Sequence, residues 1–205
     1  MKKRQQRAAV TAEQLLNGAR EVFEARGYQG TTVGAITDAA NTAHGTFYLY
    51  FRNKEDAFAK VMAQAIEELY EEAEASWRGD LRATLARSIA GFLDVFRSHQ
   101  GLWRCLLEGM HQSTAIERMW LDLRRPFVER IERTLSYLAE RGAIRAMDTT
   151  VASHALAAMV EWFAFAHFEL GEPRTEDIDF DRAVDTLTDL WLHALFGRVE
   201  PALLS

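Results

Sequence analysis

The stretch Thr31–Lys54, TTVGAITDAANTAHGTFYLYFRNK, decides the fold, because it contains two short helical segments separated by a tight break. Its opening, TTVGAITDAAN, begins with hydroxyl side chains that can cap a helix. Ile36 and Ala40 follow four residues apart, so they lie on one apolar face of that helix. Asn41-Thr42-Ala43 forms the break. The first half of the stretch therefore predicts a short helix that packs through one side.

The second half of the stretch, His44–Phe51, is predicted to form one compact helix. Phe47 and Phe51 lie four residues apart and can anchor this helix to a core, while the polar side chains near its start point elsewhere. Two short helices separated by about three residues, with polar groups at the start of the second, are typical of a helix-turn-helix that places a recognition helix in the major groove of DNA.

Candidate DNA contacts follow from this arrangement. Hydroxyl and ammonium donors near helix starts bind phosphate oxygens, which sets the register on DNA without reading its sequence. The groups at the head of the second helix are placed to read base edges. Tyr50 can reach a phosphate or pack beside Phe51. The predicted DNA-binding residues are Thr32, Thr42, His44, Gly45, Thr46, Tyr48, Tyr50 and Lys54.

The run A-(x)2-A-H-G-T-F-Y-L-Y-F-x-N-K-E-D-A-F resembles the N-terminal DNA-binding signature of the TetR family of transcriptional regulators, over about residues 10 to 60. The resemblance implies an all-helical homodimer, a DNA operator, and a small-molecule inducer site in the C-terminal part. It places the family's contact tyrosine on Tyr48 and its helix-start lysine on Lys54. The chain departs from the family pattern at His44, where a basic residue is frequent, and at Gly34, where many members carry a polar residue or arginine.

The charge distribution supports a DNA-binding head, although the formal net charge of the chain is −6. Residues 1–60 hold nine Lys/Arg and six acids, whereas residues 61–205 hold fifteen Lys/Arg and twenty-four acids. A basic head is attracted to phosphates, and an acidic body is repelled by them. Lys2, Lys3, Arg4 and Arg7 are expected to form an arm that is either a solvated tail or a further DNA contact.

Composition indicates an all-α protein, because 48% of the residues are hydrophobic, only three are prolines, and the apolar residues recur at helical spacing. A single cysteine, Cys105, excludes an intrachain disulfide and fits a reducing compartment. The basic start is not followed by a long apolar stretch, so no signal peptide is expected. The most apolar segment, Ala155–Phe168, is interrupted by Glu161 and His167 and is too short to span a bilayer. We expect a soluble cytoplasmic protein.

About nine helices are expected in two domains: a three-helix DNA-binding domain at residues 1–53 and a ligand-binding and dimerisation domain at residues 54–205. Thr11 is predicted to cap the first helix and Gly27 to end it, and Asn53 is predicted to cap the helix that begins at Lys54. Pro126 is predicted to kink or restart a helix, and Gly142 to stop it. The predicted helices cover residues 11–26, 31–40, 44–51, 54–77, 81–99, 101–112, 113–141, 149–170 and 178–196.

The last two helices are predicted to form the dimer interface, because each carries apolar residues on two faces. One row of the first contains Val151 or Ala155, then Ala158, Trp162 and Phe165. Two such helices from each subunit can pack as a symmetric four-helix interface. A two-fold dimer would hold two recognition helices about 34–36 Å apart, as a palindromic operator requires.

An apolar inducer site is predicted in the body of the chain, which holds more aromatic surface than helix packing normally needs. Such sites are mostly apolar with a few polar groups, and Glu108, His111, Glu161 and His167 could supply those. The ligand is expected to be lipophilic or aromatic, with a cation plausible beside a glutamate and a tryptophan. A constitutive regulator whose aromatic body is solid core is the alternative. The predicted lining residues are Phe92, Phe96, Trp103, Leu107, Met110, Trp120, Phe127, Met159, Trp162 and Phe163.

An enzyme is the competing hypothesis, because Glu108-x-x-His111 resembles half of a di-iron carboxylate site. The pair occurs once, without the second copy that such a site needs. Asp177-x-Asp179-x-Asp181 begins like a calcium loop but lacks its glycine and glutamate, so these acids are expected to cap a helix. Cys105 lies among apolar residues without an adjacent base. We predict no cofactor, no metal and no catalytic residue, and a ligand-responsive regulator, most simply a repressor.

Overall fold

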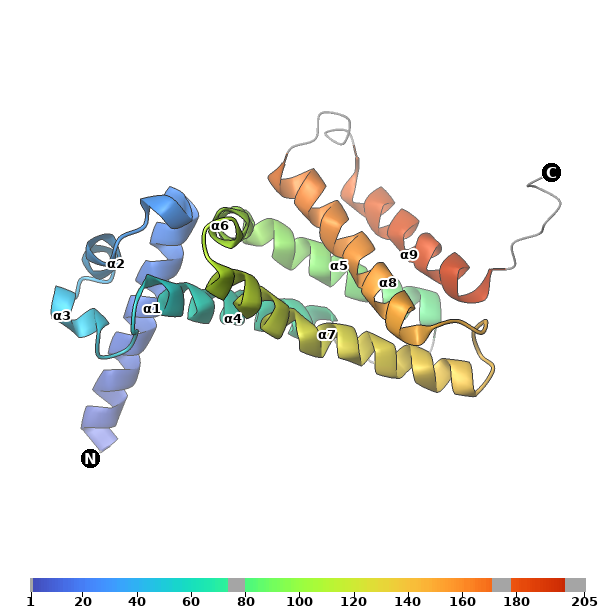
Figure 1. Cartoon of the computed structure of the whole chain (residues 1–205), viewed down its shortest axis with the longest axis horizontal. Helices are drawn as coiled ribbons and strands as arrows, with labels where there is room; N and C mark the ends of the chain where they lie inside the picture. Colours follow the sequence, from blue (N-terminus) through green and yellow to red (C-terminus); the bar gives the residue numbers. More distant parts are fainter. Residues whose placement is uncertain (1, 74–79, 171–177, 198–205) are drawn as a thin grey trace. The chain divides into compact units, whose positions relative to one another are not determined.

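The polypeptide is helical throughout the part that the structure describes, which is residues 2–73, 80–170 and 178–197 of a computed structural model (Figure 1). No strand is present in these ranges, so the predicted all-α class is confirmed. The helices are α1 (Lys2–Gly30), α2 (Val33–Ala39), α3 (His44–Phe47), α4 (Lys54–Ala73), α5 (Leu81–Ser98), α6 (Gln100–Met110), α7 (Thr114–Glu140), α8 (Thr149–Ala164) and α9 (Phe180–Phe196), with a π-helical turn, η1 (Phe165–Glu169), after α8.

The first helix is longer than predicted. It begins at Lys2, and Thr11 is not its cap, since the Thr11 hydroxyl donates to the carbonyl of Arg7 one turn earlier at 3.0 Å. The predicted arm is therefore part of the helix. Gly27 interrupts α1 as expected, with φ of 68°, a left-handed conformation that glycine adopts without strain.

The chain forms two compact units. Unit 1 comprises residues 1–68 and 96–123, and unit 2 comprises residues 69–95 and 124–205. The predicted DNA-binding domain, residues 1–53, lies entirely in unit 1, which also contains the first part of α4 and all of α6. The predicted boundary at residue 53 remains a prediction about function.

Unit 1 has a core where α1, α2 and α6 meet α4. Phe23 is fully buried, and its ring centroid lies 4.9 Å from that of Phe58 and 6.2 Å from that of Tyr28, which itself lies 5.4 Å from Phe58. Gly101 and Gly109 let α6 approach closely: a Cβ at Gly101 would lie 2.8 Å from the Glu24 backbone. The dense aromatic centre and the glycine contacts make α6 part of the scaffold that holds α1.

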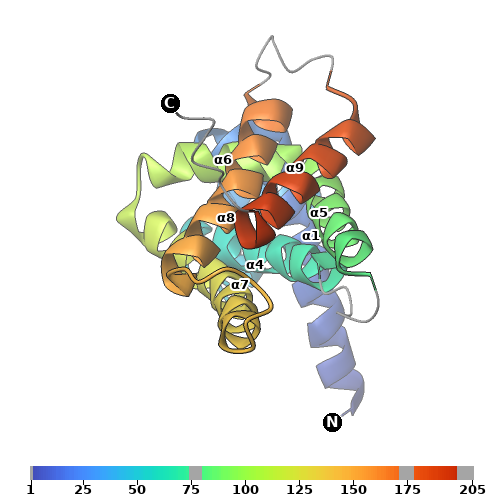
Figure 2. The same cartoon turned by 90° about the vertical axis from the view of Figure 1, so that its right-hand side faces the viewer.

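Unit 2 consists mainly of α5, α7, α8 and α9 (Figure 2). Asp148 caps α8 by accepting from Val151 N at 3.0 Å, and Asp179 caps α9 by accepting from Arg182 N at 3.1 Å, as the acids before this helix predicted. The α7 helix continues through Pro126 without a restart, and Gly142 ends it with φ of 64°, as predicted.

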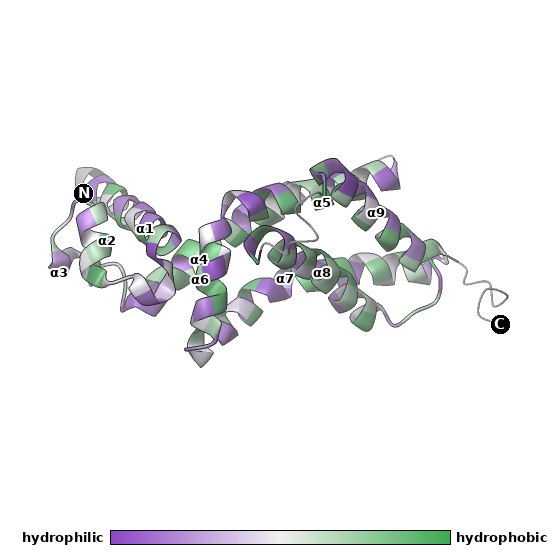
Figure 3. Cartoon of the chain, turned by 90° about the horizontal axis from the view of Figure 1, so that it is seen from above, coloured by the Kyte–Doolittle hydropathy of each residue, from purple (hydrophilic) through white to green (hydrophobic). Residues whose placement is uncertain are grey.

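The segment Thr149–Glu169 is the most apolar helical segment, and much of α8 is coloured hydrophobic in Figure 3. By length and composition alone it could cross a membrane, and only 33% of it is buried. Core helices of soluble proteins meet the same criterion. A charged residue, Glu161, lies within it and is paired with Arg124 of α7. Much of the exposed surface of α8 is therefore apolar.

Candidate nucleic-acid interface and ligand cavity

The two short helices α2 and α3 form the predicted helix-turn-helix in unit 1. Thr32 caps α2 by accepting from Ala35 N at 3.1 Å, while Ile36 and Ala40 are buried, as their spacing predicted. Asn41 makes the break between the helices with a positive φ of 50°, a conformation that asparagine tolerates better than most residues.

The second helix is shorter than predicted. Regular α3 ends at Phe47, and residues 48–50 continue as turns, so the predicted single helix over residues 44–51 is wrong in length. The anchoring prediction is correct: Phe47 and Phe51 are both buried, with their ring centroids 5.1 Å apart. Two aromatic anchors fix the segment without a long helix.

The polar groups at the head of α3 are displayed to solvent. His44 and Gly45 are exposed, Thr46 is half-buried, and Tyr48 retains 56% of its accessible surface. The neighbouring Leu49 is 79% exposed, although it is apolar. Buried phenylalanines beneath an exposed edge of hydroxyl, imidazole and backbone groups give a surface that can contact a nucleic acid.

The remaining predicted DNA contacts differ in their surroundings. Thr32 is exposed, whereas Tyr50 is half-buried, and its backbone carbonyl accepts from Lys60 Nζ at 2.7 Å. The hydroxyl oxygen of Thr42 is shielded from solvent and has no hydrogen-bond partner. Thr42 and Tyr50 are therefore less accessible than the residues at the head of α3.

Lys54 begins α4 and contacts Tyr28 of α1, which the sequence did not indicate. Its Nζ donates to the carbonyl of Tyr28 at 2.8 Å and lies 4.3 Å from the centre of the Tyr28 ring. The start of α4 is capped as predicted, since Asn53 accepts from Asp56 N at 2.8 Å. Lys54 thus fixes the start of α4 to the end of α1.

Both backbone polar groups of Tyr28 are held, because its N–H also donates to the Glu108 carboxylate of α6 at 3.0 Å. Gly27 makes this possible: a Cβ there would lie 2.6 Å from the carboxylate oxygen. We name this arrangement the Tyr28 clamp, formed by Lys54, Tyr28 and Glu108. The Glu108 carboxylate therefore accepts a hydrogen bond from a backbone N–H and is not an isolated polar group.

The surroundings of the clamp also determine the chemistry of Cys105. Burial raises the pKa of its thiol, the Glu108 carboxylate raises it further, and Lys54 opposes them only in part. Cys105 is buried and stays protonated, as an inert thiol does. His111, at the end of α6, is exposed. Among the described residues, no group of three or more His, Cys, Asp and Glu side chains is placed to hold a metal ion.

An apolar cavity of about 90 Å³ lies within unit 2, between α5, α7, α8 and α9. Its wall is mostly aliphatic and aromatic, with a few polar side chains contributed by Ser88, Arg130, Thr134 and Trp191. The lining residues are Leu81, Leu85, Ser88, Ile89, Phe92, Phe127, Arg130, Ile131, Thr134, Leu135, Ala157, Val160, Trp191, Leu192 and Leu195.

The structure brings only two of the predicted lining residues, Phe92 and Phe127, to this cavity, with their ring centroids 6.3 Å apart. Phe96, Trp103, Leu107, Met110 and Trp120 belong to unit 1, where the Phe96 and Trp103 rings stack at 4.6 Å. On α8, Met159 and Phe163 are half-buried and Trp162 is exposed, and none of the three lines the cavity.

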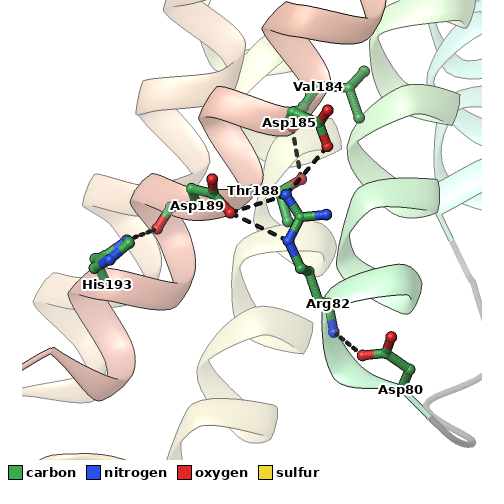
Figure 4. Close-up of polar contacts among 7 residues, drawn as sticks. All are labelled: Asp80, Arg82, Val184, Asp185, Thr188, Asp189 and His193. Atoms are coloured by element: carbon green, nitrogen blue, oxygen red, sulfur yellow. Dashed lines mark hydrogen bonds and ion pairs between the residues drawn. The ribbon is translucent and has the colours of Figure 1, made fainter.

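Two ion-pair sites hold the helices around the cavity. The Arg124 Nε of α7 bonds both carboxylate oxygens of Glu161 on α8, at 2.8 and 2.9 Å. Burial raises the pKa of Glu161, and the Arg124 charge only partly offsets this effect. The second site lies at the start of α5, where Arg82 bonds Asp185 and Asp189 of α9 at 3.2 and 3.0 Å (Figure 4).

An exposed apolar row runs along α8. Val151 and Trp162 are each 63% exposed, and Ala155 and Ala158 lie exposed between them at spacings of three and four residues. On α9, Leu190 and Phe196 are also exposed. On α8 this row follows the predicted one as far as Trp162, but Phe165 is buried, and Leu190 of α9 was not among the predicted residues. The row accounts for the low buried fraction of α8.

Sequence reasoning missed Trp191 and Leu195 as cavity residues and placed them only in an apolar row of the last helix. Their apolar pattern places both on the inward side of α9, but it cannot say whether an inward side chain meets a neighbour or a void. Sequence reasoning also missed the Tyr28 clamp, because Lys54 and Glu108 lie 26 and 80 residues from Tyr28 along the chain.

Comparison with known proteins agrees with this architecture. The pattern of the family described as "Bacterial regulatory proteins, tetR family" matches residues 15–61, and that of "Transcriptional regulator EthR, C-terminal domain" matches residues 85–197. The Fatty acid metabolism regulator protein of Bacillus subtilis is 41% identical over 63 residues, which are 29% of this chain and 32% of that protein.

Two solved structures show the same fold. A TetR-family transcriptional regulator from Mesorhizobium loti aligns with a TM-score of 0.76 and 18% identity, over 93% of this chain and 98% of that one. The transcriptional regulator FadR from Bacillus subtilis, in complex with stearoyl-CoA, aligns with a TM-score of 0.70 and 20% identity, over 91% and 99% of the two chains.

Proposed function

Because this chain belongs to the TetR family of bacterial transcriptional regulators, we propose that it is a repressor that binds a palindromic operator as a homodimer and is released by a lipophilic ligand. The observation that carries the proposal is the exposed polar edge of α3 above the buried Phe47 and Phe51. It acts on DNA in the cytoplasm and catalyses no reaction.

Base reading is assigned to His44, Gly45 and Thr46, which head α3, the first two exposed and the third half-buried. Phosphate contacts are assigned to Thr32, Thr42, Tyr48, Tyr50 and Lys54. An ammonium has three donors, and the Tyr28 carbonyl takes one of them, so Lys54 keeps donors for a phosphate oxygen. Tyr48 has no such competing role, since its ring is more than half exposed.

Dimerisation is assigned to the exposed apolar row of α8 with Leu190 and Phe196 of α9. A contiguous apolar face of this kind is unfavourable in water and marks an interaction surface. A second copy is the simplest occupant, because a palindromic operator requires a two-fold arrangement of reading heads.

The ligand is assigned to the apolar cavity of unit 2. A volume of about 90 Å³ is far below the roughly 300–1,000 Å³ of pockets that enclose a drug-sized molecule. Such a narrow space favours a flexible alkyl chain over a rigid polycyclic ring, with some outward movement of the lining. A fatty acyl group fits this description. The names of the two Bacillus subtilis proteins, one a fatty acid metabolism regulator and one bound to stearoyl-CoA, support the same class.

Release from DNA would follow if the ligand binds one arrangement of the dimer better than the other. The α4 helix provides the covalent path, since Lys54–Glu68 belongs to unit 1 and the same helix continues from Leu69 in unit 2. Ligand in the cavity would then change the separation of the two α3 segments and lower affinity for the operator.

Selection of bound duplexes from a random pool, repeated with and without stearoyl-CoA, tests the proposal. We expect a palindromic consensus without ligand and loss of binding with it. Thr46→Ala should change the consensus, whereas Tyr48→Phe should weaken binding to all sequences alike. Recovery of no enriched duplex at low salt would contradict the DNA-binding function.

Sedimentation of Trp162→Glu tests the interface separately. A buried charge in the apolar row should shift the protein from dimer to monomer, because an unpaired desolvated charge is costly. Arg133→Gln, on the exposed face of α7, makes the same net charge change of one unit and should leave the dimer intact. A Trp162→Glu protein that sediments as a dimer would remove α8 from the interface.

A further inference from the structure

The cavity wall contains a polar atom that the fold leaves unsatisfied. Trp191 is 7% exposed and lines the cavity, and its indole Nε1 is shielded from solvent and has no hydrogen-bond partner. Among the described residues of the wall, Trp191 is the one with such an atom. The Thr134 hydroxyl, in contrast, donates to the Arg130 carbonyl at 3.1 Å, and the Arg130 guanidinium lies 5.9 Å from the centre of the Phe127 ring.

A buried tryptophan normally satisfies its N–H, because leaving a donor without a partner costs the full desolvation of that group. Trp103 of this chain follows the rule: its Nε1 donates to the carbonyl of Phe96 at 2.9 Å. Trp191 breaks the rule, and its side chain is among those that line the cavity. An unused donor on a side chain that lines an unfilled apolar space is what a binding site for a mainly apolar ligand with one acceptor would leave behind.

We infer that the Trp191 indole N–H donates to the carbonyl oxygen of a slender alkyl ligand, and that it makes the cavity selective for acyl compounds over plain hydrocarbons. This inference rests on the proposed function and adds the residue that recognises the polar group. Since an indole N–H can only donate, it favours ligands that present an acceptor and gives no bond to an alkyl ammonium. An ester, thioester or ketone carbonyl satisfies this requirement.

Nitrogen-15 labelling of the tryptophan indoles tests the contact in the native full-length protein. The Trp191 signal is identified by its absence from the spectrum of Trp191→Phe. We expect its indole proton to move downfield when 2-decanone is added and to move much less with 1-decene, which has the same chain length without the oxygen. A Trp191 indole proton that responds equally to both compounds overturns the inference.

Affinity measurements give an independent test. Displacement of a fluorescent apolar dye should show 2-decanone binding about tenfold more weakly to Trp191→Phe than to the parent, because one buried hydrogen bond is lost. The Kd of 1-decene should change about twofold or less, since the aromatic ring remains. Leu192→Ala is the packing control and should weaken both compounds by similar factors.

The outcomes separate the inference from the function on which it rests. If neither compound binds the parent or displaces the dye, the cavity is not a ligand site and the proposed inducer function fails. If both compounds bind the parent and Trp191→Phe changes their Kd values by the same factor, the cavity binds ligands but Trp191 does not recognise the carbonyl.

Discussion

The two tryptophans of the two compact units show how differently these units are built. Trp103 in unit 1 is stacked on Phe96 and donates to its carbonyl, whereas Trp191 in unit 2 lines a void and leaves its N–H unused. Both residues are buried. Burial alone does not determine how well a side chain is packed, because its neighbours must also provide a hydrogen-bond partner and fill the space around it.

The same contrast extends to the backbone. In unit 1 the carbonyl of Tyr28 accepts from Lys54 and its N–H donates to Glu108, so the end of α1 has little freedom. In unit 2 the lining helices enclose about 90 Å³ without filling it. A reading head must hold its register against DNA, and a sensor must be able to change. The distribution of packing between the units fits these two tasks.

Removing the best-satisfied contact of unit 2 should have the largest effect. Arg124→Met leaves the half-buried Glu161 carboxylate without its partner, and we expect unfolding free energy to fall by about 3 kcal/mol near neutral pH. The double change with Glu161→Gln should restore most of it. Urea denaturation measures both, and an unchanged Arg124→Met protein would show that the pair contributes nothing.

This variant should also change its stability with pH. Burial raises the pKa of Glu161 above its ordinary value of 4.5 in the folded state, and loss of Arg124 raises it further. Folded Glu161 then binds its proton more tightly than unfolded Glu161, so unfolding free energy falls as the pH rises from about 4.5 through the folded pKa. The difference between parent and variant should therefore shrink towards pH 4.

The tryptophan contrast can be tested with matched changes. Trp103→Phe removes the Nε1 bond to the Phe96 carbonyl, which keeps its bond from the His99 N–H at 3.2 Å, and the loss of the bond and of ring volume should cost about 2 kcal/mol of unfolding free energy. Trp191→Phe removes a donor that was already unsatisfied, so its cost should be at most half as large. Equal losses in thermal or urea unfolding would mean that the unused N–H is not unsatisfied in solution.

The Tyr28 clamp should contribute a smaller amount. Glu108→Ala leaves the Tyr28 N–H without an acceptor, and we expect a loss of about 1–2 kcal/mol in unfolding free energy. Glu108→Gln keeps an acceptor and should lose less than half of that. If alanine and glutamine variants unfold alike in urea, the hydrogen bond is not what Glu108 contributes.

The surface ion pairs of unit 2 should give the smallest effect. Arg82 bonds Asp185 and Asp189, but all three side chains are about half exposed, so water and salt screen the attraction (Figure 4). Arg82→Ala should unfold in urea at nearly the parent midpoint. A large shift would show that this contact matters more than its exposure indicates.

Sequence patterns predicted what depends on near neighbours in the chain. Ile36 and Ala40, Phe47 and Phe51, and the Asn53 cap each lie within four residues of their partners, and the structure confirms them. Local patterns failed where long-range packing decides. Two aromatic anchors hold residues 44–51 although the regular helix stops at Phe47, and α1 begins nine residues before its predicted cap.

Of the lining residues predicted from aromatic content, only Phe92 and Phe127 lie at the cavity. A helical pattern identifies inward side chains such as Trp103 and Trp191 equally well, but it does not state which unit they enter or whether space remains beside them. That information arises from helices far apart in the sequence. The predicted sites of DNA contact and dimerisation remain predictions until the variants above are measured.

The burial of Cys105 has a practical consequence. It is the only cysteine of the chain, and its protonated, enclosed thiol should resist maleimide reagents. A cysteine introduced at an exposed position of α1, such as Glu13→Cys, would therefore take up a dye at one site per subunit. In the proposed dimer, energy transfer between donor- and acceptor-labelled copies would report the distance between the two DNA-binding heads as ligand is added.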